Sequence, residues 1–171
     1  DSVKDREEAE DLTGGAERML SKGGFKVKFW LFSGDAAEEE QGITEILGVS
    51  WNPKEDQIVG QASLNFSPKK RGVYTLPDLN PDEIPRLIPK VLTRRMVLAQ
   101  VMRIYDPFGM WSPVILKGKV LLRETWECQL GWDDAVPADL HERWVRFFIA
   151  SKELNGLRYP RVLKPAEAVG D

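Results

Sequence analysis

The sequence has very few of the residues on which disulfide and transition-metal sites depend. Its 171 residues include one cysteine, Cys128, and one histidine, His141. A single cysteine excludes an internal disulfide framework and a zinc site of the CxxC type, and a single histidine excludes a histidine-rich metal cluster. No apolar run approaches the roughly 20 residues that span a bilayer, so we expect no membrane partner. The motifs GxxxxGK[ST] and GxGxxG are also missing, which excludes nucleotide binding by those two routes.

What the sequence does contain is typical of a globular domain. Apolar residues make up 42% of the chain and charged residues 30%, and we expect an intracellular protein. The net charge of -3 hides an uneven distribution: residues 1–56 have 7 basic and 14 acidic side chains, residues 57–125 have 11 and 5, and residues 126–171 have 6 and 8. A basic block between acidic flanks is either a solvated surface or the footprint of a polyanion.

The first part of the chain alternates helix and strand signals. A helix is predicted up to Gly23-Gly24, because apolar residues recur at helical spacing: Leu12, Ala16, Met19 and Leu20. Residues 25–32 alternate apolar and basic side chains and then become fully apolar, which predicts a strand. Residues 46–51 are predicted to be the first strand of a hairpin, residues 52–56 its turn, and residues 57–66 are predicted to contain the returning strand.

Prolines and helix caps organise the second part. Residues 67–92 contain five prolines and are predicted to be an extended basic connector with one short turn of helix. Thr93 is a good N-cap for a helix that reaches Tyr105, and residues 106–109 form an elbow. Further helices are predicted over residues 112–129 and from Pro137 to about residue 155. The fold class is therefore α+β, an N-terminal helix, strand and hairpin followed by a three-helix bundle.

Three catalytic readings find little support in the spacing of the residues. A Cys128–His141 nucleophile pair lacks an orienting partner, so we expect Cys128 to pack and His141 to be solvated. Asp133-Asp134 is either a Mg²⁺ ligand pair or, as we favour, the cap of the following helix. An aspartic peptidase needs Asp-Thr-Gly or Asp-Ser-Gly, and neither residues 11–14 nor residues 33–35 have that order.

Basic and aromatic residues indicate nucleic-acid binding instead. Arg94, Arg95 and Arg103 fall on one predicted helix and Lys117 and Lys119 on the next, as a helix pair that follows a phosphate backbone requires. Trp51 is predicted at the tip of the hairpin, where it either stacks on a base or packs in the turn.

Short motifs along nearly the whole chain resemble the Pol polyprotein of BEL/Pao-type LTR retrotransposons. The motifs that resemble it, in order, are Gly23-Gly24-Phe25-Lys26-Val27-Lys28, Leu47-Gly48-Val49-Ser50-Trp51-Asn52-Pro53-Lys54, Leu92-Thr93-Arg94-Arg95, Tyr105-Asp106-Pro107-Phe108-Gly109, Ser112-Pro113, Trp132-Asp133-Asp134 and Tyr159-Pro160-Arg161.

This resemblance implies the end of a reverse transcriptase. Residues 1–66 would be a palm remnant with a primer-grip-like hairpin, residues 67–92 the basic connector, residues 93–157 a thumb or connection, and residues 158–171 a tail that leads toward an RNase H-like region. The catalytic Tyr-x-Asp-Asp turn of the polymerase and its Mg²⁺ would lie outside the chain, so we expect no polymerase activity from it and no cofactor in it.

The resemblance also implies a cytoplasmic protein, its binding residues and its partners. An RNA–DNA or DNA duplex and the remainder of Pol would be the partners, and the residues expected to contact nucleic acid are Ile46, Leu47, Gly48, Trp51, Lys69, Lys70, Arg71, Arg94, Arg95, Arg103, Lys117 and Lys119. Two alternatives stay open. One is a catalytically dead, transposon-derived protein-interaction remnant, and the other, less favoured, is a Pao-type aspartic peptidase segment.

Overall fold

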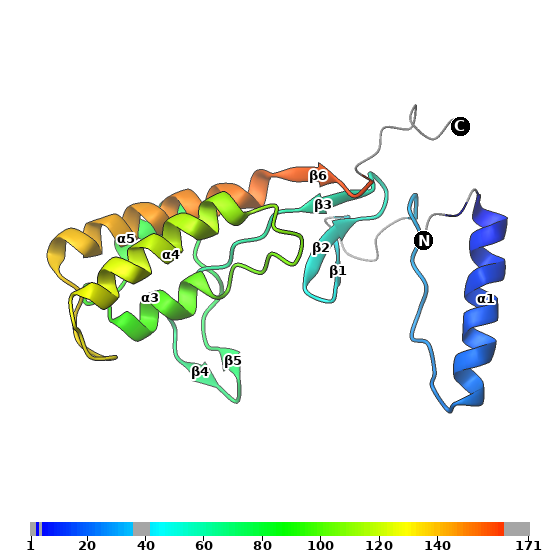
Figure 1. Ribbon diagram of the computed structural model, residues 1–171, viewed down its shortest axis with the longest axis horizontal. Coiled ribbons are helices and arrows are strands. Elements are labelled where there is room, and N and C mark those ends of the chain that lie inside the picture. Colours follow the sequence, from blue (N-terminus) through cyan, green and yellow to red (C-terminus); the bar gives the residue numbers. More distant parts are fainter. Residues whose placement is uncertain (1–2, 4, 36–41, 163–171) are drawn as a thin grey trace.

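The computed structural model describes residues 3, 5–35 and 42–162. Figure 1 shows two parts, which we call the arm (residues 5–35) and the body (residues 42–162). The arm consists of helix α1 (Arg6–Lys22) and an extended segment that turns back along it. Asp5 begins α1, because its Oδ1 accepts a hydrogen bond from the Glu8 amide at 2.9 Å. The helix ends at Gly23 as predicted, and Gly24 follows with a φ of +80°.

The strand predicted over residues 25–32 is wrong. This segment is extended but pairs with no other strand in the described part of the chain. Phe25, Phe29 and Trp30 are exposed on it. Alternating side chains favour an extended backbone, but a strand also needs a neighbour for its ladder of hydrogen bonds.

The body begins with a four-stranded antiparallel sheet of order β1-β2-β3-β6. Its strands are β1 (Thr44–Ile46), β2 (Val49–Asn52), β3 (Gln57–Val59) and β6 (Arg158–Pro160). The β2–β3 hairpin and its turn are confirmed, and the return strand expected within residues 57–66 is β3. The prediction of a continuous strand over residues 46–51 is wrong, because Leu47 and Gly48, with φ of +51° and +80°, form a tight turn between β1 and β2.

The predicted connector carries more structure than its prolines indicated. It contains a small hairpin of β4 (Lys69–Lys70) and β5 (Val73–Tyr74), the 3₁₀ turn η1 (Pro81–Glu83) and the short helix α2 (Ile84–Leu87). The expected turn of helix is therefore present. Ile84, Ile88 and Leu92 are buried in the main core, so this segment also forms part of the body.

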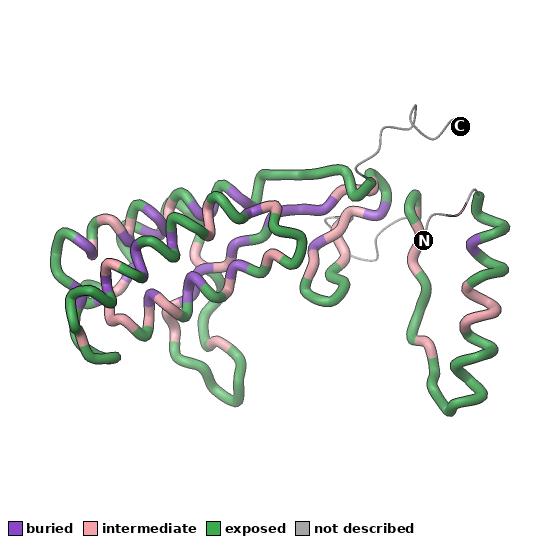
Figure 2. Tube along the Cα trace, in the orientation of Figure 1, coloured by how far each residue is buried: buried purple, intermediate pink, exposed green. Residues whose placement is uncertain are grey.

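Three helices complete the body: α3 (Arg94–Val101), α4 (Ser112–Glu127) and α5 (Ala138–Ser151), the last continued by η2 (Lys152–Gly156). Thr93 caps α3 as predicted, with its Oγ1 3.3 Å from the Met96 amide. The predicted elbow is also present, because the Asp106 carboxylate accepts hydrogen bonds from the amides of Met110 and Trp111. Figure 2 shows the buried residues concentrated between these helices. The mixed helix-and-sheet fold class is thus confirmed.

Candidate nucleic-acid interface

A group of exposed cations lies on the β4–β5 hairpin, which projects from the body in Figure 1. Lys69, Lys70 and Arg71 are all exposed there. Arg71 and Gly72 have φ of +53° and +83°, which is the geometry of a tight two-residue turn. Lys69 Nζ lies 4.7 Å from the centre of the Tyr74 ring, and none of the three cations forms an ion pair within the described residues. We call Lys69, Lys70 and Arg71 the basic tip.

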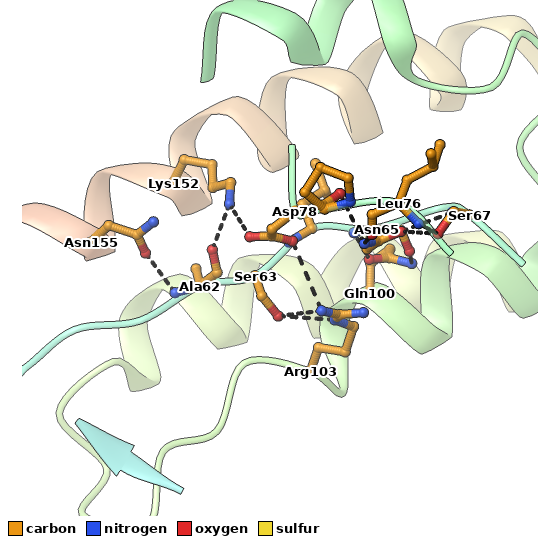
Figure 3. Close-up of polar contacts among 12 residues, drawn as sticks. Ala62, Ser63, Asn65, Ser67, Leu76, Asp78, Gln100, Arg103, Lys152 and Asn155 are labelled. Atoms are coloured by element: carbon orange, nitrogen blue, oxygen red, sulfur yellow. Dashed lines mark hydrogen bonds and ion pairs between the residues drawn. The ribbon is translucent and has the colours of Figure 1, made fainter. Parts of the chain in front are cut away.

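The base of this hairpin is held rigidly. Asn65 Nδ2 donates to the carbonyls of Leu76 and Pro77, and Asn65 Oδ1 accepts from both the amide and the hydroxyl of Ser67. The Ser67 hydroxyl in turn accepts from the Leu76 amide at 3.2 Å. These bonds, drawn in Figure 3, fix the direction in which the basic tip projects.

Arg94, predicted to face a phosphate backbone, is instead part of an aromatic cluster. Its guanidinium lies 3.7 Å from the centre of the Trp126 ring and 5.2 Å from that of Trp132. It also donates to the carbonyl of Leu130. The side chain therefore joins the start of α3 to the loop after α4, a cation–π arrangement that stabilises the body.

Arg95 pairs with Asp133, an acid that was expected to cap the following helix. Its Nε and Nη2 donate to Asp133 at 2.8 and 3.0 Å, and these hydrogen bonds hold the pKa of the Asp133 carboxyl below its usual value. Asp134 accepts from the Gly131 amide at 2.7 Å. The prediction that this acidic pair caps the next helix is wrong, since α5 begins at Pro137 without a side-chain cap. Among the described residues, no three acidic, histidine or cysteine side chains lie together as metal ligands would.

Arg103 belongs to a polar network that the sequence did not reveal (Figure 3). Its Nε and Nη2 donate to Ser63 Oγ at 3.0 and 2.6 Å, and its guanidinium lies 4.3 Å from the centre of the Tyr74 ring. Asp78 lies 3.9 Å from Nη2. Arg103 thus connects α3 to the extended segment of residues 60–67 and to β5.

The same network contains a buried lysine. Lys152 is only 4% exposed in its side chain, and its Nζ donates to Asp78 Oδ2 at 2.6 Å and to the Ala62 carbonyl at 3.0 Å. Gln100 and Asn65 exchange two hydrogen bonds, from the Asn65 amide to Gln100 Oε1 and from Gln100 Nε2 to the Asn65 carbonyl. Side chains thus satisfy backbone groups of residues 60–67 that lack a strand partner. In the sequence, the only indication of this network is that its polar residues interrupt apolar patterns of helical period.

The turn between β1 and β2 holds three of the predicted contact residues. Ile46 is partly exposed, and Leu47 at the tip is 91% exposed. A Cβ on Gly48 would lie 3.3 Å from the Tyr105 ring, so the position requires glycine both for its φ and for this close approach. Of residues 46–48, predicted as part of one strand, Ile46 therefore ends β1, and Leu47 and Gly48 form a turn that lies against Tyr105, just before the elbow.

Trp51 lies within β2 and not at a tip. Its Nε1 donates to Asp56 Oδ1 at 3.0 Å, and Asp56 also accepts from Arg161 at 2.7 and 3.0 Å. Burial raises the pKa of Asp56, but hydrogen bonds from Arg161, Trp51 and Ser33 outweigh this effect, so the pKa lies below its usual value. This cluster supports the packing alternative for Trp51, and through Arg161 and Ser33 it connects body and arm.

Lys117 and Lys119 are both exposed on α4 but do not form one track. Residues two apart on a helix point to different sides, and Lys117 lines a groove between α4 and α5. Cys128 and His141 also differ from expectation. Cys128 is exposed, whereas His141 is partly buried, with its Nε2 3.1 Å from the Pro89 carbonyl oxygen.

A cleft of about 880 Å³ lies between arm and body. Its cations are already neutralised, since Arg6 pairs with Glu10 and Asp35, and Arg161 with Asp56. The pairing with Arg6 also lowers the pKa of Asp35. The cleft is therefore mainly apolar and attracts anions weakly. Its apolar lining includes Leu31, Phe32, Ile46, Leu47, Trp51 and Phe108.

Comparison with known proteins adds one match. A family model described as a Pao retrotransposon-like RNaseH-like domain matches residues 93–169, a segment that begins at the cap of α3. The description places RNaseH-like character in a segment that we had expected to precede such a region. No curated protein and no solved structure matches the chain. None of the helices in the described part of the chain combines the length and apolar character that a bilayer crossing needs. The family-model match covers fewer than half of the 171 residues and supports a Pao-type retrotransposon Pol region in this part of the chain.

Proposed function

We propose that this Pol fragment holds a primer–template duplex by its phosphate backbone, as a thumb or connection of the element's reverse transcriptase, while the catalytic aspartates and their Mg²⁺ belong to another part of Pol. The observation that carries the proposal is the basic tip. Lys69, Lys70 and Arg71 project together on a rigid turn with no acidic partner in the described residues. Each unpaired cation of this kind neutralises one phosphate and releases a counterion.

The body supplies the rigidity that this function requires. The network around Asn65, Asp78 and Arg103 joins the base of the hairpin to α3 and to the end of α5. Contacts to the backbone position a duplex without reading its sequence. We therefore expect comparable affinity for RNA–DNA hybrids of different sequence, and the RNaseH-like description of residues 93–169 is consistent with binding to nucleic acid.

Arg94, Arg95 and Arg103 have a different part in this proposal from the one the sequence indicated. Each already has a partner within the body, namely Trp126, Asp133 and Ser63. They stabilise the body that carries the interface. The remainder of Pol supplies the catalytic centre. The chain itself needs no cofactor for this role.

The test is binding of the purified chain to a labelled RNA–DNA hybrid across a salt series. Changing Lys69, Lys70 and Arg71 to Gln removes three phosphate contacts, so the slope of log affinity against log salt should fall in magnitude by about 2.7, at roughly 0.9 per contact. The matched control changes Arg18, Lys26 and Lys28 to Gln. It removes the same charge from exposed positions of the arm and should leave the slope nearly unchanged.

Equal losses in the two triple variants would show that only net charge matters and would contradict the assignment of the basic tip. Binding that is absent or insensitive to salt in the unchanged chain would favour the protein-interaction remnant. The peptidase alternative predicts cleavage of a Pol-like peptide that is lost on changing Asp11 to Asn.

A further inference from the structure

One face of α1 is apolar and uncovered. Leu12 and Met19 are 59% and 74% exposed, and Leu20 beside them is also exposed. Figures 1 and 2 show α1 at one end of the molecule. Residues at this spacing form a stripe along one side of a helix, which is the kind of stripe that soluble helices normally bury.

A groove of complementary character lies between α4 and α5. It has a volume of about 880 Å³, and its floor includes Leu116, Val120, Phe147 and Ala150. Leu116 and Val120 are 61% and 47% exposed, so the floor is open. Lys117 and Arg146 stand on its rim.

The groove and α1 have net charges of opposite sign, because the groove is lined by Lys117, Arg143 and Arg146 against one acidic residue, Glu153. Neither Lys117 nor Arg146 has an ion-pair partner among the described residues, whereas their neighbour Arg143 is bound by Glu124. Helix α1 has an excess of carboxylates, with Glu7, Glu8, Glu10, Asp11 and Glu17 against Arg6, Arg18 and Lys22. Opposite charges on the rims favour one partner and one orientation.

We propose that α1 of a second copy of this chain docks in the α4–α5 groove. The lengths agree, since the 17 residues of α1 and the 16 of α4 correspond to about 25 and 24 Å at 1.5 Å per residue. The docked helix would add a fourth helix to α3, α4 and α5 and bury both apolar surfaces. Leu12 and Met19 would lie on Leu116 and Val120.

The position of α1 makes the contact intermolecular. In Figure 1 the arm and the helical end of the body lie at opposite ends of the longest axis. Each copy therefore offers α1 to one neighbour and its groove to another, which is a heterologous contact. Such contacts produce closed rings or open chains instead of a simple two-fold dimer.

Cross-linking tests the contact directly in the full chain. In a Cys128→Ser background, chains with Met19→Cys are mixed with chains with Val120→Cys and oxidised. We expect a covalent product that contains one chain of each kind and little product from either chain alone. Efficient self-linking of the Met19→Cys chain would overturn the proposal in favour of α1–α1 pairing. Only intramolecular linking, in a chain that carries both cysteines, would overturn it in favour of docking within one copy.

Analytical ultracentrifugation over a concentration series gives the second measurement. Met19→Glu and Val120→Glu should each weaken self-association at least tenfold, whereas Leu76→Glu, at an equally exposed apolar position outside both surfaces, should not. Reversing Lys117 and Arg146 to Glu should weaken association, and adding Asp11→Lys and Glu17→Lys should restore it. A chain that is monomeric at every concentration would refute the proposal. This outcome is independent of hybrid binding, which the basic tip controls.

Discussion

Helices α1 and α5 are both amphipathic, but only α5 buries its apolar side. Of the 17 residues of α1 only Ala9 is buried, whereas α5 buries Leu140, Trp144, Phe147, Phe148 and Ser151 among its 14. The periodicity of the two segments in the sequence is similar. What differs is the rest of the chain, because α5 packs against α2 and α4 and α1 has no helix beside it in the described structure. An apolar stripe shows which side of a helix favours burial, but it does not show whether another element buries that side.

The polar contacts of arm and body differ in the same way. In the arm, Asp35 pairs with an Arg6 side chain that is half exposed, whereas in the body Asp78 pairs with Lys152, which is nearly inaccessible. Each acid also accepts a backbone N–H, Asp35 from Phe32 and Asp78 from Leu64. Solvent therefore weakens the electrostatic attraction between Asp35 and Arg6 more than that between Asp78 and Lys152. The two parts should therefore respond differently to equivalent changes.

The largest difference is expected for apolar truncation. Trp144→Ala removes a fully buried ring that stacks on Phe148 and should lower the free energy of unfolding by about 3–5 kcal/mol. Met19→Ala in the arm should change it by less than about 0.5 kcal/mol. Urea denaturation followed by tryptophan fluorescence and circular dichroism measures both. Similar losses in the two variants would mean that the arm is as well packed as the body.

The matched acids give the next contrast. Asp78→Ala leaves Lys152 buried without its counter-ion and should cost about 2–3 kcal/mol. Asp35→Ala, which also removes one ion pair and one acceptor for a backbone amide, should leave global unfolding unchanged. The double variant Asp78→Ala, Lys152→Met should recover part of the loss, since no buried charge remains. No recovery would show that Asp78 acts mainly through the Leu64 amide.

A comparison of two glycines with the same φ distinguishes the cost of backbone strain from the cost of a packing clash. Gly24 in the arm and Gly48 in the body both have φ of +80°, but only Gly48 has a neighbour, the Tyr105 ring, within reach of an added Cβ. Gly48→Ala should cost about 1–2 kcal/mol, and Gly24→Ala about 1 kcal/mol or less. Thermal unfolding of both variants decides this. Equal shifts in Tm would show that Tyr105 moves aside freely.

The smallest effect concerns the contact between arm and body. Because the folded-state pKa of Asp56 is lowered, its ionised form stabilises the fold above its unfolded pKa of about 3.9, and this contribution disappears as pH falls through the lower folded value. Asp56→Asn should therefore cost about 1 kcal/mol at pH 7. The difference from the unchanged chain should shrink as pH falls below about 3.9, as urea titrations at several pH values would reveal. A difference that does not shrink with falling pH would contradict this assignment.

Local signals predicted much of this fold. Thr93, the Ser112-Pro113 start and the apolar stripe of α5 located helices α3, α4 and α5 of the body, because caps, prolines and 3.6-residue periodicity act within one or two turns. The basic tip was also identified from adjacent residues. Arg94, Arg95 and Arg103 were misread as a free track, because their partners Trp126, Asp133 and Ser63 lie 32 to 40 residues away along the chain.

The sequence by itself determined that helices begin after Thr93, at Ser112 and near Pro137, which residues form the basic tip, and that residues 93–169 match the Pao family model. These features depend on neighbouring residues or on short ordered motifs. The sequence did not determine every helix end, since α3 was expected to reach Tyr105 and ends at Val101. Only the tertiary structure decided that residues 25–32 are not a strand, that Leu47 and Gly48 form a turn, and which cations are free to meet a phosphate. The reason is physical. Strand pairing, burial and ion pairing each involve two segments that are distant in the sequence, and the pattern of one segment does not identify its partner.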